Sequence, residues 1–470
     1  MIEVKTGTLS NNIIKEAQEI AELFWREGLS EGAVVRIEYY DDYFVLGSLG
    51  EIEESFSLDS AHGFHVGREL KWAVRRICYK VLADRYGVGL NWGVLTGIRP
   101  SKIVHEMFMK GFSYQDIFDR LTGFYFVNKI KAKLLYEVSV NERAILKGTP
   151  KEAIGLYVGI PFCPSTCLYC SFTSNPIGRY RDKVHCYLDA LEKEVREVSL
   201  MIEEGGLFVE SLYIGGGTPT SLDADGLERL FLFLQENLDL TKLKEYTVEA
   251  GRPDTINHEK LSIIKRFGIS RISINPQTMN DNVLSVIGRR HNGKDVVSAF
   301  RLARKIGFDN INMDLICGLP EDSLKSFKKS FDEVLELCPE NITVHTFSVK
   351  RASVFNRHKN DYELSADVAG MVDYAYKRAK EDGFLPYYLY RQRNILGNLE
   401  NVGYAKEGCE SLYNVQIMQE RQSIIALGAG AISKIFYRDE NRIERIFNVK
   451  SVEDYISRID EMIKRKRGFL

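Results

Sequence analysis

The chain has 470 residues, of which 63 are Lys or Arg and 65 are Asp or Glu, so its formal net charge is −2. This near balance gives no indication of a nucleic-acid partner or an anionic membrane, and no apolar stretch approaches the roughly 18 residues that a membrane-spanning helix needs. The 8 cysteines, with no secretory signal at the start of the sequence, predict a reduced cytoplasmic protein.

The N-terminal part, residues 1–148, is predicted to form a separate α+β domain, since the length fits two or three domains. Apolar residues over Asn11–Arg26 recur with helical spacing. Over Val34–Leu49 apolar and polar residues alternate, which predicts a β-hairpin with Asp41 and Asp42 at its tip.

Two further helices are expected in this part of the chain. One is predicted over Gly67–Tyr86, and another begins at Ser101, after a glycine-containing turn at residues 91–100. Pro100 marks the boundary because proline restricts the residue before it, and Ser101 is a candidate N-cap. Residues 147–150, with the sequence Lys-Gly-Thr-Pro, form the predicted linker.

Residues 149–365 show short apolar segments that alternate with longer amphipathic ones. Such alternation is typical of parallel strands joined by right-handed helical crossovers, so an α/β fold is predicted. The expected strands are Leu156–Pro161, Ser211–Gly215, Tyr246–Ala250, Arg271–Asn275, Asn310–Ile316 and Asn341–Phe347. The expected helices include Lys183–Ile202, Ala224–Glu236, Val296–Ile306 and Ser323–Leu337.

The tail, residues 366–470, is predicted to be a mixed and mainly helical C-terminal domain. A helical pattern comes first, and the aromatic and glycine-rich segments that follow are interpreted as loops. Helical patterns then return in the last part of the tail.

Three cysteines, Cys163, Cys167 and Cys170, follow the first predicted strand with the spacing C-x3-C-x2-C. Cysteine thiolates hold iron–sulfur clusters, and three ligands for four irons leave one iron open to another ligand. A structural zinc site usually needs four Cys or His ligands in two pairs, and no second pair stands nearby. The motif therefore indicates a cluster that does chemistry on a bound molecule.

A glycine run, residues 215–217, follows the second predicted strand and leads into Thr218. In parallel α/β barrels the chemistry lies at the carboxyl ends of the strands. Glycines there allow the backbone to approach a ligand closely. Alone, such a run is more often only a turn, but its position downstream of the cysteine motif favours a binding role.

Polar residues also stand at the ends of the later predicted strands. They are Glu249, Gln277, Asp314 and Ser348, with Arg289 in a nearby loop. A carboxylate that ends a buried strand is costly unless it has partners, so Glu249 and Asp314 indicate hydrogen bonds to a ligand. The alternative is a structural pairing of these carboxylates with Arg252 or Arg271.

The cysteine motif, with Tyr169 before its last cysteine, and the glycine run resemble the radical S-adenosylmethionine enzymes. The resemblance implies a partial (β/α)6 barrel, here with an additional N-terminal α+β domain and a mixed, mainly helical C-terminal domain. It also implies two cofactors, a [4Fe-4S] cluster held by Cys163, Cys167 and Cys170, and S-adenosylmethionine, whose amino and carboxylate groups chelate the open iron. Transfer of one electron to the sulfonium would then give a 5′-deoxyadenosyl radical.

A closer resemblance extends from about residue 155 onward. The segments Tyr157–Cys163, Asp314–Pro320 and Leu427–Ser433 resemble the oxygen-independent coproporphyrinogen III dehydrogenase family. The tracts 97–102 and 386–394 resemble its HemZ-like branch. The implied reaction is the anaerobic oxidative decarboxylation of two propionates of coproporphyrinogen III to give protoporphyrinogen IX, in haem biosynthesis.

The resemblance also implies roles for individual residues. Gly216, Gly217 and Thr218 match the signature for the amino group of S-adenosylmethionine, while Glu249 and Arg289 match residues that hold its carboxylate. Gln277 and Asp314 match residues that bind the ribose. Tyr169, Ile316 and Ser348 match residues that frame the adenine, and Tyr157 matches a tyrosine near the cluster and the substrate.

The implied partners are a tetrapyrrole and an electron donor such as flavodoxin or ferredoxin. An arginine can hold a carboxylate with two hydrogen bonds, so cations of the barrel end and the tail are candidates for orienting propionates, although each is as readily a solvated surface charge. These candidates are Lys350, Arg351, Arg391 and Arg393.

The sequence departs from the best-established dehydrogenases at two positions. They carry a fourth cysteine where this chain has Phe172, and a histidine where it has Gly159. A related haem-chaperone branch also lacks the fourth cysteine, but usually carries a His-Asn pair followed by Tyr-Trp where residues 412–417 here have neither His nor Trp. A haem carrier and a radical enzyme of anaerobic haem breakdown therefore remain the alternatives.

Overall fold

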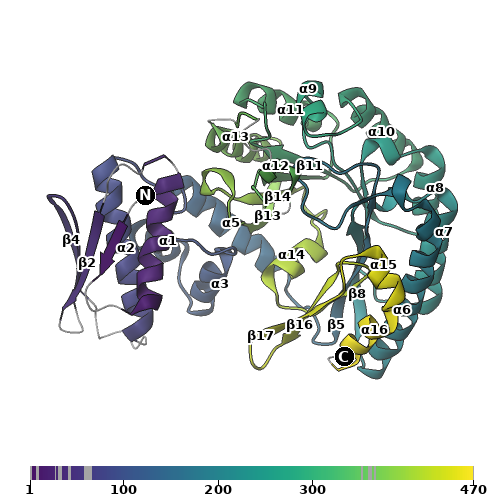
Figure 1. The fold of residues 1–470 in the computed structure, drawn as a ribbon, viewed down its shortest axis with the longest axis horizontal. Helices are drawn as coiled ribbons and strands as arrows, with labels where there is room; N and C mark the ends of the chain where they lie inside the picture. Colours follow the sequence, from purple (N-terminus) through teal and green to yellow (C-terminus); the bar gives the residue numbers. More distant parts are fainter. Residues whose placement is uncertain are drawn as a thin grey trace. The chain divides into compact units, whose positions relative to one another are not determined.

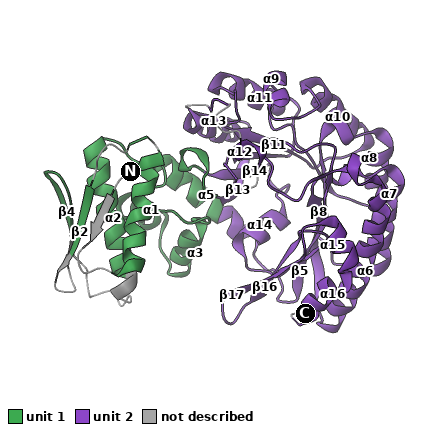
Figure 2. Cartoon of the chain, viewed as in Figure 1, with its two compact units in different colours: residues 1–139, 391–399 green, residues 140–390, 400–470 purple. Residues whose placement is uncertain are grey.

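The computed structural model describes residues 3–6, 10–26, 28–29, 34–40, 44–57, 66–350, 353–357, 362–364 and 367–468. The chain divides into two compact units (Figure 2), the first made of residues 1–139 and 391–399, the second of residues 140–390 and 400–470. The boundary between these units lies inside helix α5 (Lys129–Ile145), and the predicted linker, residues 147–150, belongs to the second unit.

The first unit contains a four-stranded sheet in the order β1-β2-β3-β4. Its strands are β1 (Glu3–Thr6), β2 (Val34–Tyr40), β3 (Phe44–Leu49) and β4 (Ile52–Ser57). The predicted hairpin is confirmed, because β2 and β3 pair antiparallel, while its expected tip at Asp41 and Asp42 lies outside the described residues. The predicted helices correspond to α1 (Asn11–Arg26) and α2 (Val66–Tyr86).

Three more helices, α3 (Ser101–Met109), α4 (Tyr114–Asp119) and α5, belong wholly or partly to this unit. Ser101 begins α3 as expected, but it is not the N-cap. Pro100 occupies that position without a side-chain hydrogen bond, and Ser101 is already inside the helix and buried. α4 instead carries a capping box, in which Ser113 and Asp116 satisfy each other's backbone amides.

The tail segment 391–399 belongs to the first unit. Arg391 is buried there; it donates to the carbonyls of Leu95 and Asn398, and its guanidinium lies 5.2 Å from the centre of the Trp92 ring. The guanidinium of Arg391 is therefore engaged within the first unit, which argues against its predicted contact with a propionate.

The second unit is built on an eleven-stranded sheet in the order β13-β14-β12-β11-β10-β9-β8-β5-β15-β16-β17. All six predicted strands are confirmed and pair parallel in chain order. They are β5 (Ala153–Ile160), β8 (Phe208–Gly216), β9 (Glu245–Gly251), β10 (Arg271–Ile274), β11 (Ile311–Cys317) and β12 (Asn341–Thr346).

Helices lie in an arc outside these strands (Figure 1). They are α6 (Val184–Glu204), α7 (Ala224–Asn237), α8 (His258–Arg266), α10 (Gly293–Ile306) and α11 (Leu324–Glu336). The ends of α10 show why the helices could be predicted from the sequence. Asn292 and Asp295 form a capping box at its start, and Gly307, with a φ of 100°, ends it.

The tail contributes five strands to the same sheet. They are β13 (Leu385–Tyr390), β14 (Asn401–Ala405), β15 (Ile424–Leu427), β16 (Ile432–Tyr437) and β17 (Arg442–Phe447). β15 pairs parallel with β5, and β14 pairs antiparallel with β12. The aromatic segment that the sequence suggests as a loop is therefore the strand β13, whereas Gly428 and Gly430 lie in the loop between β15 and β16, as expected. The three-domain division stays a prediction.

A buried ion pair joins the tail to the barrel. Glu194 on α6 accepts hydrogen bonds at one oxygen from Lys466 (2.7 Å) and Asn448 (2.8 Å). Its other oxygen accepts from the Tyr455 hydroxyl (2.5 Å) and the amide of Gly428 (2.8 Å). Every lone pair of a fully buried carboxylate is thus engaged, which is the condition under which such burial is tolerated. Lys466 lies on α16 (Ile459–Arg467).

No helix within the described ranges is both long and apolar enough to cross a membrane. The longest, α2 and α6, have 21 residues each but carry charged side chains along their whole length. The cytoplasmic location stays a prediction.

Candidate active site

In several parallel strands one residue is half-buried while its neighbours are buried. The half-buried residue is Tyr157 in β5, Glu249 in β9, Asp314 in β11 and His345 in β12. Side chains on the face of a strand that is covered by helices are buried. A polar, half-buried side chain therefore marks the opposite face, which opens into the barrel. Three of these four residues were predicted as site residues from the sequence.

Side-chain contacts connect these positions across neighbouring strands. Tyr157 stacks on Tyr213 of β8 with ring centres 6.2 Å apart, and the Tyr213 hydroxyl donates to Glu249 Oε1 at 2.6 Å. Tyr413 of α14 (Leu412–Gln419) stacks on both rings, with its centre 4.5 Å from that of Tyr213 and 6.3 Å from that of Tyr157. The Oδ2 atom of Asp314 lies 3.7 Å from His345 Nε2.

The two carboxyl groups of this set differ in their protonation behaviour. Burial raises the pKa of Glu249 to about 7, although a hydrogen bond from Tyr213 acts in the opposite direction. Burial also acts to raise the pKa of Asp314, but contacts with His345 and a 2.7 Å hydrogen bond from Asn312 keep it below its ordinary value. Near neutral pH, Glu249 can therefore donate a hydrogen bond, while Asp314 only accepts.

The cysteine loop follows β5 and is held by backbone hydrogen bonds at its centre. Cys163 closes the short strand β6 (Phe162–Cys163), and the Cys170 amide donates to the Cys167 carbonyl at 3.1 Å. The amide of Leu168 donates to Ile287 O at 3.0 Å. All three thiols are free, with Cys163 and Cys167 buried and Cys170 half-buried.

The glycine run packs directly against this loop. The Gly217 amide donates to Ile160 O (2.8 Å), and the Thr218 amide donates to Phe162 O (2.7 Å). A Cβ atom on Gly217 would lie 2.5 Å from Phe162 O and 3.0 Å from Cys163 Sγ. No side chain fits there, so the glycine is required for the cysteine loop to take its place.

The three thiols fit an iron–sulfur cluster. Burial, with a smaller contribution from the nearby Cys170 and Cys167, raises the pKa of Cys163 to about 11 although a hydrogen bond with Thr218 acts in the opposite direction, so the sulfurs lie near one another. Among the described residues no three Cys, His, Asp or Glu side chains are arranged around a single metal ion. A cubane takes one thiolate per iron, so its ligands need not converge on one point.

Two predicted site residues carry buried polar atoms that have no partner among the described residues, Arg289 Nε and Gln277 Oε1. The other nitrogens of Arg289 donate to the Tyr169 hydroxyl (2.9 Å) and Asn275 O (3.2 Å). Gln277 has a φ of 70°, and its backbone N–H donates a hydrogen bond to Asp314 O at 2.9 Å. Buried polar groups are rarely left unpaired, so both atoms indicate a polar ligand.

Ile316 and Ser348 are buried at the ends of neighbouring strands. Ile316 is the penultimate residue of β11, and its backbone amide donates to Gln277 O at 2.9 Å, while Ser348 follows β12. The amide of Phe347 donates to Cys317 O at 2.9 Å, which ties the two strand ends together. Their contact with adenine stays a prediction.

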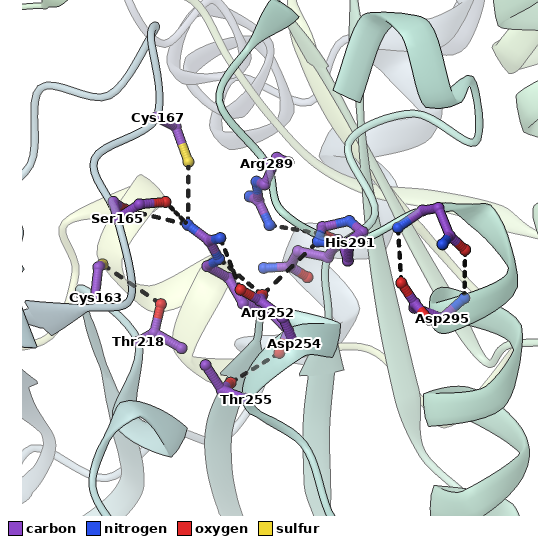
Figure 3. Close-up of polar contacts among 12 residues, drawn as sticks. Cys163, Ser165, Cys167, Thr218, Arg252, Asp254, Thr255, Arg289, His291 and Asp295 are labelled. Atoms are coloured by element: carbon purple, nitrogen blue, oxygen red, sulfur yellow. Dashed lines mark hydrogen bonds and ion pairs between the residues drawn. The ribbon is translucent and has the colours of Figure 1, made fainter. Parts of the chain in front are cut away.

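The alternative that Glu249 and Asp314 form structural ion pairs with Arg252 or Arg271 is wrong. Arg252 pairs with Asp254 and not with Glu249, and Arg271 donates to the carbonyl of Cys409. Figure 3 shows Arg252 directed at the cysteine loop, a contact that sequence reasoning missed. The missed aromatic contacts are those of Tyr213 and Tyr413.

The remaining candidate cations differ in their surroundings. Lys350 is half-buried, and burial lowers its pKa. Arg393 is exposed and belongs to the first unit, as does Arg391. Arg351 lies outside the described residues.

A cavity of about 530 Å³ adjoins the cysteine loop. Its wall includes Tyr157 and Gly216 from the barrel, Phe172 from the segment after Cys170, and Ile432 and Lys450 from the tail. The side chain of Phe172 is 78% exposed, so a large aromatic ring stands free beside the cavity. The wall also includes polar residues, which are Ser171, Thr173, Ser174, Asn175 and Ser451. The cavity therefore suits a ligand that combines apolar surface with polar and negatively charged groups.

The chain matches known proteins along most of its length. The family model described as the radical SAM superfamily matches residues 157–334. The chain is 39% identical over 408 residues to the oxygen-independent coproporphyrinogen-III oxidase-like protein HemZ of Bacillus subtilis (strain 168), a match that covers 86% of this chain and 81% of that protein. It is 34% identical over 310 residues to the heme chaperone HemW of the same strain, covering 65% of this chain and 76% of that protein.

Among solved structures, the coproporphyrinogen III oxidase HemN from Escherichia coli matches with a TM-score of 0.54. The sequence identity is 24%, and the match covers 68% of this chain and 72% of that one. At this identity the likeness shows the fold, and the predicted α/β barrel is confirmed.

Proposed function

The chain belongs to the radical SAM superfamily and, within it, to the oxygen-independent coproporphyrinogen-III oxidase-like family, and on that premise we propose that it oxidatively decarboxylates two propionates of coproporphyrinogen III. The product would be protoporphyrinogen IX, in anaerobic haem biosynthesis. Members of this superfamily use a [4Fe-4S] cluster and S-adenosylmethionine.

In this proposal the cluster is held by Cys163, Cys167 and Cys170, whose loop is packed on the glycine run. Gln277 Oε1, which would accept a hydrogen bond, and Arg289 Nε, which would donate one, are unpartnered and would hold S-adenosylmethionine. When bound, the reduced cluster and S-adenosylmethionine supply a carbon-centred radical that can take a hydrogen atom from the substrate.

The two carboxyl groups of the barrel suit different parts of such a ligand. Asp314, ionised and accepting, suits the ribose hydroxyls. Glu249, with a pKa of about 7, can hydrogen-bond the methionine carboxylate in its protonated form, and the positive charge of Arg289 suits the same carboxylate. Tyr213 holds the Glu249 carboxyl in place through its 2.6 Å hydrogen bond.

The proposal of a tetrapyrrole substrate is supported chiefly by the cavity beside the cysteine loop. A tetrapyrrole has broad apolar faces and propionates at its rim, which suits the exposed ring of Phe172 and the ammonium group of Lys450. Both positions at which the sequence departs from the best-established dehydrogenases, Gly159 and Phe172, line this cavity. The departures therefore fall where the substrate would be contacted, and leave the cysteine ligands unaffected.

The reaction balances for each propionate as follows. The side chain loses a hydrogen atom from its β-carbon, carbon dioxide and one electron, and a vinyl group remains. The hydrogen atom ends in 5′-deoxyadenosine, and the electron leaves to a one-electron acceptor. A donor such as flavodoxin or ferredoxin would reduce the cluster before each turnover.

The match to a haem chaperone supports a second candidate, a haem carrier. Haem iron in proteins is held by His, Cys, Met or Tyr. At residues 412–417, where the chaperone branch carries its histidine, this chain has Tyr413, which is buried and packed against the rings of Tyr213 and Tyr157. This packing disfavours the carrier, and a radical enzyme of haem breakdown is the remaining alternative.

The proposal is tested with the anaerobically reconstituted, reduced protein, S-adenosylmethionine and coproporphyrinogen III, with products followed by mass spectrometry. Loss of two carbon dioxide units, coupled to formation of 5′-deoxyadenosine, is the expected result. The triple variant Cys163→Ala, Cys167→Ala, Cys170→Ala is the control and should form neither product. Deoxyadenosine without a change in coproporphyrinogen would point to haem as substrate, and tight haem binding with neither product would point to the carrier.

A further inference from the structure

Arg252 stands in the turn that follows β9, where a particular backbone path directs its side chain toward the cysteine loop. Gly251 has a φ of 44°, which favours glycine, and Pro253 begins a short 3₁₀ turn. The Thr255 hydroxyl donates to the Arg252 carbonyl at 2.7 Å and closes the turn. The side chain of Arg252 is almost completely buried.

The guanidinium of Arg252 is held from one side by Asp254. Nε donates to Asp254 Oδ1 at 3.0 Å and Nη2 donates to Oδ2 at 2.9 Å, which is the two-pronged geometry that fixes the plane of the group. His291 Nδ1 lies 3.8 Å from the same carboxylate. The buried orientation of Arg252 is therefore set before any ligand binds.

The remaining nitrogen, Nη1, faces the cysteine loop (Figure 3). It donates to the Ser165 hydroxyl at 2.9 Å and to the Ser165 carbonyl at 3.1 Å, and it lies 3.8 Å from Cys167 Sγ. One end of a fixed guanidinium thus meets the sulfur of a proposed cluster ligand, while the negative end of the Arg252–Asp254 pair points away from it.

We propose that Arg252 is a positioning residue of the cluster loop whose contact with the Cys167 sulfur also sets the reduction potential of the bound cluster. The inference rests on the proposed function only in requiring that Cys167 bind the cluster. Hydrogen bonds to ligand sulfurs and nearby charge are established means by which a protein tunes such a cluster.

The direction of the effect follows from the charges. Reduction adds one negative charge to the cluster, so a positive group at the sulfur stabilises the reduced state and makes the potential less negative. Asp254 opposes this, because its negative charge is paired with the guanidinium on the side away from Cys167. Arg252→Gln should therefore shift the midpoint potential to a more negative value, and Asp254→Asn should shift it to a less negative one.

The test is a redox titration of the cluster-loaded full chain, in which the reduced cluster is followed by electron paramagnetic resonance. Arg252→Lys, which keeps the charge, should lie between the wild type and Arg252→Gln. Arg266→Gln is the charge-matched control, since Arg266 is exposed on α8 and pairs with Glu228, and its potential should equal that of the wild type.

Opposite shifts in Arg252→Gln and Asp254→Asn support the proposal, because damage to the loop alone would move both variants in the same direction. Shifts of the same sign, or potentials equal to that of the wild type in variants that retain a full iron load, would overturn it. Failure of the wild type itself to hold iron would instead contradict the proposed function, so the two failures are distinguishable by iron content.

Discussion

The Tyr213 hydroxyl donates a 2.6 Å hydrogen bond to a carboxyl group, that of Glu249, whose pKa burial has raised to about 7. This one hydrogen bond does not offset the effect of burial on the carboxyl group, and the Tyr213 ring is itself packed against two other tyrosine rings. Glu249 is therefore a group whose proton the folded protein retains up to neutral pH.

Glu249 should make the stability of the ligand-free protein depend on pH. Its pKa rises on folding from 4.5 to about 7, so its protonated form is favoured in the folded state, and stability is lost as the pH rises through 7. The loss amounts to at most about 3 kcal/mol. Denaturant unfolding at pH 5 and pH 8 should show this difference for the wild type and a smaller one for Glu249→Gln; equal differences would exclude the effect.

The cysteine loop should account for all iron binding. The triple alanine variant of Cys163, Cys167 and Cys170 is expected to lose the brown colour and the iron after anaerobic reconstitution, because no other thiols lie on that loop. Cys186→Ala, an exposed cysteine on α6, is the matched control and should retain the full iron load. A triple variant that kept its iron would contradict the assignment.

Asp314 should contribute to S-adenosylmethionine binding. Asp314→Asn keeps the shape of the side chain but removes a charged acceptor, so the dissociation constant is expected to rise about tenfold or more, equivalent to about 1.5–3 kcal/mol. Titration calorimetry on the cluster-loaded protein measures it. Asp332→Asn, in a surface pair with Arg378, provides the control, and an unchanged affinity in Asp314→Asn would remove this residue from the site.

Gly217→Ala should displace the cysteine loop. The new methyl group would meet Phe162 O at 2.5 Å and Cys163 Sγ at 3.0 Å, and overpacking of this kind costs about 1–3 kcal/mol. We expect a lower iron load after reconstitution and a lower thermal midpoint. Gly178→Ala, where nothing lies within 4 Å of the added atom, should behave as the wild type, and full iron loading in Gly217→Ala would contradict the packing argument.

Lys466→Met should destabilise the second unit strongly. It leaves the fully buried Glu194 without its cation, and breaking a buried pair in this way costs about 3–5 kcal/mol. Arg467→Ala, at the neighbouring position, removes only an exposed pair with Glu197 and should cost about 1 kcal/mol or less. Urea unfolding measures the loss of unfolding free energy in both variants. Similar losses would show that the buried pair contributes no more to stability than the exposed one.

The parallel strands and outer helices could be predicted because each carries its own signal. β5, β9 and β11 are short apolar runs bounded by turns, and helices such as α10 carry caps in the sequence. The tail strands lacked that signal. β13 contains Pro386 and three tyrosines, and β17, at the edge of the sheet, has three charged residues among its six, so neither resembles a buried strand.

The site was predictable where residues lie at strand ends and not where they meet through the fold. Glu249, Asp314 and the cysteines stand at positions that a strand assignment already identifies. The contact between Arg252 and Cys167 joins residues 85 apart, and the stacking of Tyr413 depends on where α14 packs. No local spacing encodes either contact.

The buried pair of Glu194 and Lys466 also constrains the order of events during synthesis. The two residues are separated by 272 positions, which a ribosome covers in roughly 14 to 54 seconds at about 5–20 residues per second. Through that interval the α6 carboxylate lacks its cation, and β5 lacks its neighbour β15. The nascent barrel therefore exposes an open strand edge next to unprotected cysteines, and insertion of a cluster into a finished site has to wait until the tail has been made.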